Sequence, residues 1–107
     1  MTKVARLRLT KGVAESRIHE ISKDSFKVVL GAHAKERMVE RDIVRRDVDQ
    51  ALRNGFVDEE PVVGAKKGEW KCKIVLSIRG RRDLGVVVIL RPNGDLWVKT
   101  VEWEDSK

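Results

Sequence analysis

A histidine and two arginines recur at every fourth residue of one highly charged stretch. The sequence "GAHAKERMVERDI" at 31–43 contains His33, Arg37 and Arg41. Residues four apart lie one turn above another on an α-helix, so these side chains should project from the same side. The spacing therefore predicts a column of one imidazole and two guanidinium groups.

Such a column offers groups that can cleave RNA without a metal. A base must remove the proton of the ribose 2′-hydroxyl, and cations must bind the negative charge on the phosphate. Histidine titrates near neutral pH, and arginine presents a fixed fork of donors that matches phosphate oxygens. We predict that His33 acts as base or acid while Arg37 and Arg41 bind phosphate. The alternative is a solvated helix face, because charged helix faces are common.

Two helices are predicted to position this column, at about 33–42 and 45–54. The second has apolar residues at helical spacing, and Gly55 provides its C-terminal stop. Val44 occupies the N-cap position of the second helix. Because valine has no side-chain acceptor, the usual N-cap hydrogen bond is expected to be absent.

From residue 56 onward the alternation of apolar and polar residues predicts a sheet. The expected strands are "WKCKIVLSIR", "VVVIL" and "LWVKTVEW", separated by turn sequences, with a short edge strand at 61–63. The predicted fold class is α+β, with N-terminal helices packed on one face of an antiparallel β-meander. Regular alternation in the last strand puts Leu96, Val98, Thr100 and Glu102 on one face and Trp97, Lys99, Val101 and Trp103 on the other.

The chain is expected to form an N-terminal extension, 1–25, followed by a single α+β domain, 26–107. In the extension, "VARLRL" alternates as a short strand would, and "VAESRIHEISKD" has apolar residues at helical spacing. The main domain opens with "FKVVL", which is predicted to be a short strand. A length of 107 residues suits one compact domain.

Composition points to a basic cytoplasmic protein that needs no cofactor. No apolar run approaches the roughly 20 residues of a membrane-spanning helix, and no signal peptide is evident. A single cysteine, Cys72, and two scattered histidines give no disulfide and no zinc spacing, so we expect neither metal nor cofactor. Twenty-three Lys and Arg against 17 Asp and Glu give a net charge of +6. This excess favours a polyanionic partner such as RNA.

The stretch "HAKERMVERDIVRRDVDQALRNG" resembles the helical signature of a bacterial domain-of-unknown-function family, number 4258. In that signature His-Ala-x-x-Arg-Met-x-x-Arg-x-Ile is followed by Asp-Val-x-x-Ala-Leu and Gly. The end, "LWVKTVEW", resembles the family's closing strand, which carries a threonine between apolar residues. The resemblance covers about residues 26–103. It implies that His33, Arg37 and Arg41 occupy the family's polar helix positions and Thr100 its strand position.

This family's architecture is similar to that of RelE/ParE-type toxins, small basic proteins of which many are metal-independent ribonucleases controlled by an antitoxin. The resemblance implies a toxin-like endoribonuclease that acts on RNA, free or on the ribosome, and has a cognate antitoxin protein. Thr100 would donate a hydrogen bond to the substrate or to His33. Because ParE-type members do not cut RNA, a non-catalytic module that binds nucleic acid or protein remains the alternative.

Other basic and aromatic residues could also contact RNA. A basic surface along one sheet face and its turns would bind phosphates without reading sequence; the alternative is solvated edge charges that discourage aggregation. Tryptophans could stack on bases, although in a small domain they more often anchor the core or a partner interface. The residues expected in the basic surface are Lys66, Lys67, Lys71, Lys73, Arg79, Arg81 and Arg82, of which the last five are the predicted nucleic-acid-binding residues.

Overall fold

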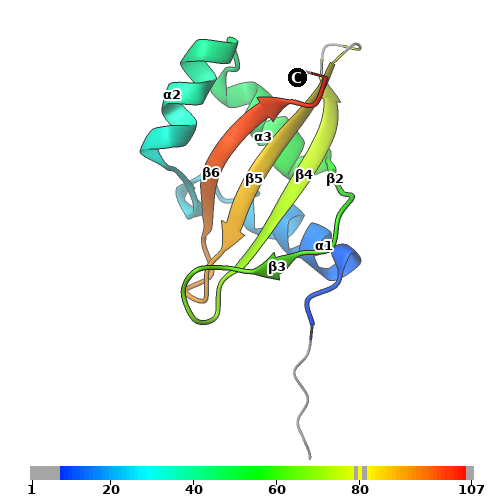
Figure 1. Cartoon of the computed structure of the whole chain (residues 1–107), viewed down its shortest axis with the longest axis vertical. Helices are drawn as coiled ribbons and strands as arrows, with labels where there is room; N and C mark the ends of the chain where they lie inside the picture. Colours follow the sequence, from blue (N-terminus) through cyan, green and yellow to red (C-terminus); the bar gives the residue numbers. More distant parts are fainter. Residues whose placement is uncertain (1–7, 79, 81, 106–107) are drawn as a thin grey trace, which may run out of the picture.

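Three helices and one six-stranded sheet make up the part of the chain that the structure describes. The computed structural model describes residues 8–78, 80 and 82–105 (Figure 1). The helices are α1 (Lys11–Ile21), α2 (Ala32–Arg41) and α3 (Arg45–Asn54), with a short 3-10 turn, η1 (Ser25–Lys27). The strands are β1 (Val28–Leu30), β2 (Phe56–Val57), β3 (Val62–Val63), β4 (Trp70–Ile78), β5 (Arg82–Leu90) and β6 (Leu96–Trp103). The predicted helices are confirmed, as are the strands near 28–30, 62–63, 70–78 and 96–103, whereas β5 begins at Arg82, inside the segment predicted as a turn, and β2 was not predicted.

The sheet is mixed, because a parallel strand that was not placed from the sequence joins one edge of the predicted antiparallel meander. Its order is β1-β6-β5-β4-β2, and β3 also pairs with β4. Strands β4, β5 and β6 form the expected antiparallel meander. Strand β1 instead pairs in parallel with β6, with Val28 opposite Leu96. No tight turn joins these two distant segments, so nothing forces them into an antiparallel hairpin.

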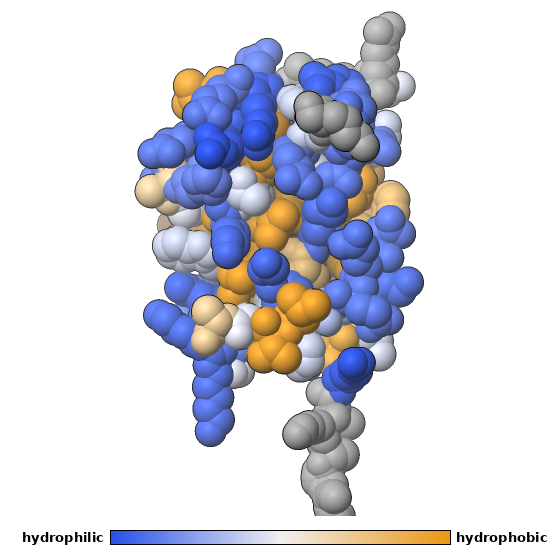
Figure 2. Space-filling view, in the orientation of Figure 1, coloured by the Kyte–Doolittle hydropathy of each residue, from blue (hydrophilic) through white to orange (hydrophobic). Residues whose placement is uncertain are grey.

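Helices α1 and α3 cover one face of the sheet and leave the other face open (Figure 1). Helix α3 packs on β4 and β5, and α1 packs on α3 and β2. Between these layers lies the hydrophobic core, to which every long strand contributes alternate residues. Helix α2 lies beside β6. On the open face, Figure 2 shows hydrophobic surface along the middle with hydrophilic surface on both sides. Core residues include Ile18, Val48, Leu52, Ile74, Leu84, Val86, Val88 and Val98.

A β-bulge in β6 overturns the predicted faces of this strand. Val98 pairs with Val88 and Thr100 pairs with Val87, so Lys99 is an extra residue without an opposite partner. An extra residue breaks the strict alternation of a strand. Beyond it, the core side of β6 is occupied by Val101 and Trp103 rather than by Thr100 and Glu102. Thr100 lies with Val87 on the open face.

Local hydrogen bonds define where α3 begins and ends. The N-cap residue Val44 makes no side-chain capping bond, as predicted. The carboxylate of Asp47 compensates, because it accepts a hydrogen bond from the Val44 backbone nitrogen at 3.2 Å. At the other end Gly55 is the C-cap, and its nitrogen donates to the Ala51 carbonyl at 2.8 Å. The predicted stop at Gly55 is confirmed.

The N-terminal segment joins the same core as the rest of the chain. Thr10 caps α1 by accepting a hydrogen bond from the Val13 nitrogen at 3.2 Å. On α1, Ala14 and Ile18 are fully buried, and the predicted helix is confirmed. Most of the predicted strand "VARLRL" lies outside the described residues. Its described end at residues 8–9 is not in a strand, although Leu9 is buried.

Two glycine substitutions should change stability in opposite directions. A Cβ at Gly12, on α1, would meet nothing within 4 Å; Gly12→Ala should stabilise by about 0.4–1 kcal/mol, because alanine loses less entropy in a helix. A Cβ at Gly55 would lie 2.5 Å from the Ala51 carbonyl oxygen and 2.7 Å from that of Val75. Gly55→Ala should therefore destabilise by about 1–3 kcal/mol. Urea unfolding followed by circular dichroism measures both; equal midpoints for the two variants would contradict this packing.

Candidate functional site

Helix α2 runs beside β6 in the same direction. At its start, the Gly31 nitrogen donates to the Val98 carbonyl at 3.0 Å. At its end, Arg41 Nη1 donates to the Val101 carbonyl at 2.7 Å, and Trp103 Nε1 donates to the Arg41 carbonyl at 2.9 Å. These three bonds hold α2 along the part of β6 that β1 does not reach.

The three residues of the predicted column share helix α2 but have different environments. His33 is exposed, and no hydrogen bond or ion pair joins it to a described residue. Arg37 forms an ion pair with Glu40 at 2.6 Å, with 30% of its side chain exposed. Arg41 is used to bind the Val101 carbonyl. Of the three, His33 is therefore the group most available to a ligand.

Thr100 and Lys99 both lie on the open face, contrary to the prediction that they point to opposite faces. Thr100 is opposite Val87, and Lys99 borders the same surface groove as Trp97. The bulge is the physical reason, because it adds one residue exactly where alternation would have separated the two side chains. Arg41 binds the carbonyl of the residue next to Thr100. No hydrogen bond joins His33 and Thr100 among the described residues.

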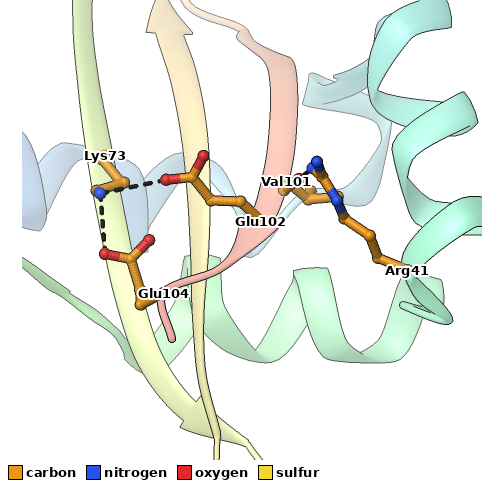
Figure 3. A network of polar contacts seen from close by, with 5 residues as sticks. All are labelled: Arg41, Lys73, Val101, Glu102 and Glu104. Atoms are coloured by element: carbon orange, nitrogen blue, oxygen red, sulfur yellow. Dashed lines mark hydrogen bonds and ion pairs between the residues drawn. The ribbon is translucent and has the colours of Figure 1, made fainter. Parts of the chain in front are cut away.

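The predicted basic surface is only partly available for phosphate binding. Lys73 makes ion pairs with Glu102 at 3.3 Å and Glu104 at 2.9 Å, as Figure 3 shows beside the Arg41–Val101 contact. The hydrogen bond to Glu104, with the nearby negative charges, raises the pKa of Lys73. Arg82 pairs with Asp105 at 3.1 Å. Its guanidinium also lies 4.2 Å from the centre of the Trp103 ring. Arg79 and Arg81 lie outside the described residues.

Lys71 belongs to a different environment, a groove of about 460 Å³ on the open face. We call it the open-face groove. The segment between β3 and β4 forms one side, and residues from β4, β5 and β6 form the rest. Within the described ranges, Lys66, Lys71 and Lys99 take part in no ion pair, and the one carboxylate of the groove, that of Glu69, accepts a hydrogen bond from the Lys66 backbone nitrogen at 3.2 Å. Residues that line the open-face groove include Val62, Lys66, Glu69, Lys71, Ile89, Trp97 and Lys99.

Sequence reasoning missed several of these residues. Lys99 was assigned to the wrong face, and the Lys73 pairs with Glu102 and Glu104 were not foreseen. One signal was present, namely Gly85 in the otherwise apolar strand "LGVVVIL". A Cβ at Gly85 would clash with the Glu104 carboxylate and lie 3.1 Å from Lys73 Cδ. Glycine inside a strand often marks such a close approach.

A match to a family model confirms one part of the resemblance noted in the sequence, the family itself. A family model described as a domain of unknown function (DUF4258) matches residues 30–103. The chain belongs to this family. The DUF4258 segment contains α2, α3 and strands β2 to β6, and it leaves α1 outside. No curated protein and no solved structure matches the chain.

Two further features bear on what this DUF4258 domain can do. Among the described residues, no helix has the length and apolar character needed to cross a bilayer. The same part of the chain contains no cluster of three or more His, Cys, Asp or Glu side chains suited to a metal ion.

The two arginines of the column should differ in their effect on stability. Arg41→Ala removes a charged hydrogen bond to a backbone carbonyl and should cost about 1.5–3 kcal/mol. Arg37→Ala removes a surface ion pair and should cost no more than about 1 kcal/mol. Urea unfolding of both variants beside the wild type measures the difference. An equal loss in both would show that the Arg41–Val101 bond does not hold α2 in place.

Cys72 should be unreactive in the folded protein. Burial raises the pKa of its thiol to about 11, whereas a free cysteine has a pKa near 8.5, and only the thiolate attacks a disulfide reagent. At about pH 8 the native protein should therefore react very slowly with Ellman's reagent, and unfolding in urea should restore rapid reaction. Fast reaction of the native protein would contradict the burial of Cys72.

Proposed function

We propose that this DUF4258 protein is a RelE/ParE-like, toxin-type protein that binds RNA on its open sheet face and cleaves it without a metal. The observation that carries the proposal is the bulge at Lys99. It adds a cation to the face that holds Thr100, next to the edge where α2 carries His33. A net charge of +6 and the cation-lined open-face groove support RNA as the polyanion.

In the proposed reaction His33 is the base. Its ring nitrogen takes the proton of the ribose 2′-hydroxyl, and the 2′-oxygen forms a bond to phosphorus. The bond from phosphorus to the 5′-oxygen breaks, and this oxygen takes a proton from water. The products are a 2′,3′-cyclic phosphate and a 5′-hydroxyl. Thr100 donates a hydrogen bond to the phosphate or to His33.

The structure changes which cations we expect to bind the scissile phosphate. Arg41 already donates a hydrogen bond to the Val101 carbonyl of β6, so we expect it to contribute little to phosphate binding. Arg37 is paired with Glu40 at the surface, where such pairs are weak and a phosphate can compete. Lys99 makes no ion pair among the described residues and lies on the same face as Thr100. We therefore assign phosphate binding to Arg37 and Lys99.

A toxin-type protein is held inactive by a cognate antitoxin. An acidic antitoxin that covers the cationic open face would block RNA without any change in the fold. The proposed partners are accordingly RNA, free or on the ribosome, and a small acidic protein.

The second candidate is a non-catalytic module that binds RNA or protein through the same face. Two observations support it: Arg41 donates its hydrogen bond to the Val101 carbonyl, and no hydrogen bond joins His33 and Thr100 among the described residues. For such a module, RNA binding should weaken steeply with salt while no cleavage product forms.

The cleavage proposal predicts a specific pattern of loss in variants. In EDTA, wild type should cut an unstructured RNA to products with 2′,3′-cyclic phosphate ends. His33→Ala should lower the rate by at least about 100-fold, because general base catalysis contributes that much. Thr100→Val keeps the shape but removes one hydrogen bond and should lower it by about 3- to 10-fold. Rates come from gel analysis of end-labelled RNA.

Lys35→Ala is the matched control for His33→Ala, since Lys35 is an exposed residue of the same helix. Its rate should equal that of wild type. Unchanged cleavage in both His33→Ala and Arg37→Ala would overturn the assignment of the site. RNA binding without any product from the wild type would favour the non-catalytic module instead.

A further inference from the structure

The open-face groove combines an apolar floor with unpaired cations, and this combination calls for a particular ligand. Ile89 on β5 lies opposite Trp97 on β6, and both side chains border the groove. Val62 of β3 adds to the apolar lining. Figure 2 shows hydrophobic surface on this face between hydrophilic side chains. A ligand that fills the groove must therefore present a flat or apolar group as well as negative charge.

Trp97 is fixed in position before any ligand binds. Gly31 has no side chain, and a Cβ there would lie 2.9 Å from Trp97 Cζ2, so the indole packs directly against the backbone before α2. The Arg91 guanidinium lies over the ring, 5.1 Å from its centre, so a planar ligand must pack on the part of the indole that Arg91 leaves uncovered. Asp95 holds Arg91 through bonds of 2.6 and 2.8 Å. A ring fixed in this way loses little entropy when a planar group packs against it.

The cations of the groove come from three separate segments. Lys66 lies between β3 and β4, Lys71 lies on β4, and Lys99 is the bulge residue of β6. None of the three has an ion-pair partner within the part of the chain described. Lys73, by contrast, is neutralised by two glutamates although it is only two residues from Lys71. Three unpaired lysines against one carboxylate, that of Glu69, thus leave an excess of positive charge around the apolar floor.

We propose that the open-face groove binds single-stranded RNA, with an unpaired base packed against Trp97 and Ile89 and with phosphates bound by Lys66, Lys71 and Lys99. Aromatic side chains that stack bases inside a positively charged groove characterise single-strand binding sites. A duplex keeps its base faces inside the stack and would leave the apolar floor uncovered. An acidic peptide matches the lysines but offers no comparable flat group to Trp97.

A neighbouring hollow limits the direction of the strand. It lies over β4 and β5 and is lined by three carboxylates, Glu59, Glu60 and Glu102, and by two lysines, Lys71 and Lys73, of which Lys73 is already paired with Glu102. Carboxylates at this place repel phosphates, so the strand should leave the groove toward Lys99 and α2. This inference deepens the proposed function, because the strand then passes the helix that carries His33. It depends on binding alone, so it can fail or succeed independently of cleavage.

The test measures binding of an RNA oligonucleotide that cannot be cut. Fluorescence anisotropy with a short 2′-O-methyl RNA, alone or annealed to its complement, gives affinity at several salt concentrations. The variants are Lys66→Ala, Lys71→Ala, Lys99→Ala, Trp97→Ala and Trp97→Phe in the full chain. Lys67→Ala is the matched control, because Lys67 is an exposed neighbour of Lys66 that does not line the groove.

The single strand should bind more tightly than the duplex. Each groove-lysine variant should weaken binding and reduce the slope of log affinity against log salt by about 0.7, the value for one phosphate of a single strand. Lys67→Ala should leave both unchanged. Trp97→Ala should weaken binding by about 5-fold or more without changing the salt slope, because stacking is not ionic. Trp97→Phe keeps a ring and should retain most of the affinity.

Three results would overturn the inference. The first is tighter binding of the duplex, and the second is equal loss in Lys67→Ala and Lys66→Ala. The third is full affinity in Trp97→Ala, which would reduce the groove to a site for charge alone. Should Trp97→Ala fail to fold, substitution of Ile89 by Asn removes part of the same apolar floor and must weaken binding in its place. Displacement of the RNA by a polyglutamate peptide at equal charge concentration would assign the groove to an acidic protein instead.

Discussion

The backbone of β6 beyond Val98 has a strand partner on one side only, and this constraint organises the molecule. Polar backbone groups at a sheet edge must find hydrogen-bond partners, or they are left as a template for other chains. Here β1 pairs with β6 as far as Val98. Beyond that point Arg41 of α2 donates a hydrogen bond to the Val101 carbonyl. Trp103 returns a hydrogen bond to the end of α2. The hydrogen bonds that the unpaired edge of β6 requires therefore determine where α2 lies, and with it His33.

The same strand carries the bulge that shapes the open face. One extra residue at Lys99 returns Val101 and Trp103 to the core and sends Thr100 to the open side. A strand without the bulge would have buried Thr100 and Glu102 in their place, at the cost of polar groups without suitable partners. The core thus requires the bulge, and the exposed position of Lys99 follows from the packing of residues on the opposite side.

The parts of this structure that sequence predicted well are those set by local patterns. The helices α2 and α3 follow from periodicity and from the stop at Gly55, and β4 follows from the alternation that begins at Trp70. The bulge could not be predicted, because it depends on how β6 aligns with Val87 and Val88 of another strand. The column of His33, Arg37 and Arg41 was correct as helical geometry. The sequence could not show that Arg41 donates a hydrogen bond to β6, because the acceptor, the Val101 carbonyl, lies 60 residues away.

Net charge alone would not have located a binding surface on this protein. Part of the predicted basic surface is neutralised, because Lys73 lies between Glu102 and Glu104 across the narrow gap left by Gly85. Charges paired in this way help to hold β4 and β6 on either side of β5 and have little left for a ligand. The lysines of the open-face groove have no such partners among the described residues. Whether a lysine of this sheet is structural or free to bind a ligand therefore depends on its neighbours, and for Lys73 the absence of a side chain at Gly85 is what lets Glu104 approach.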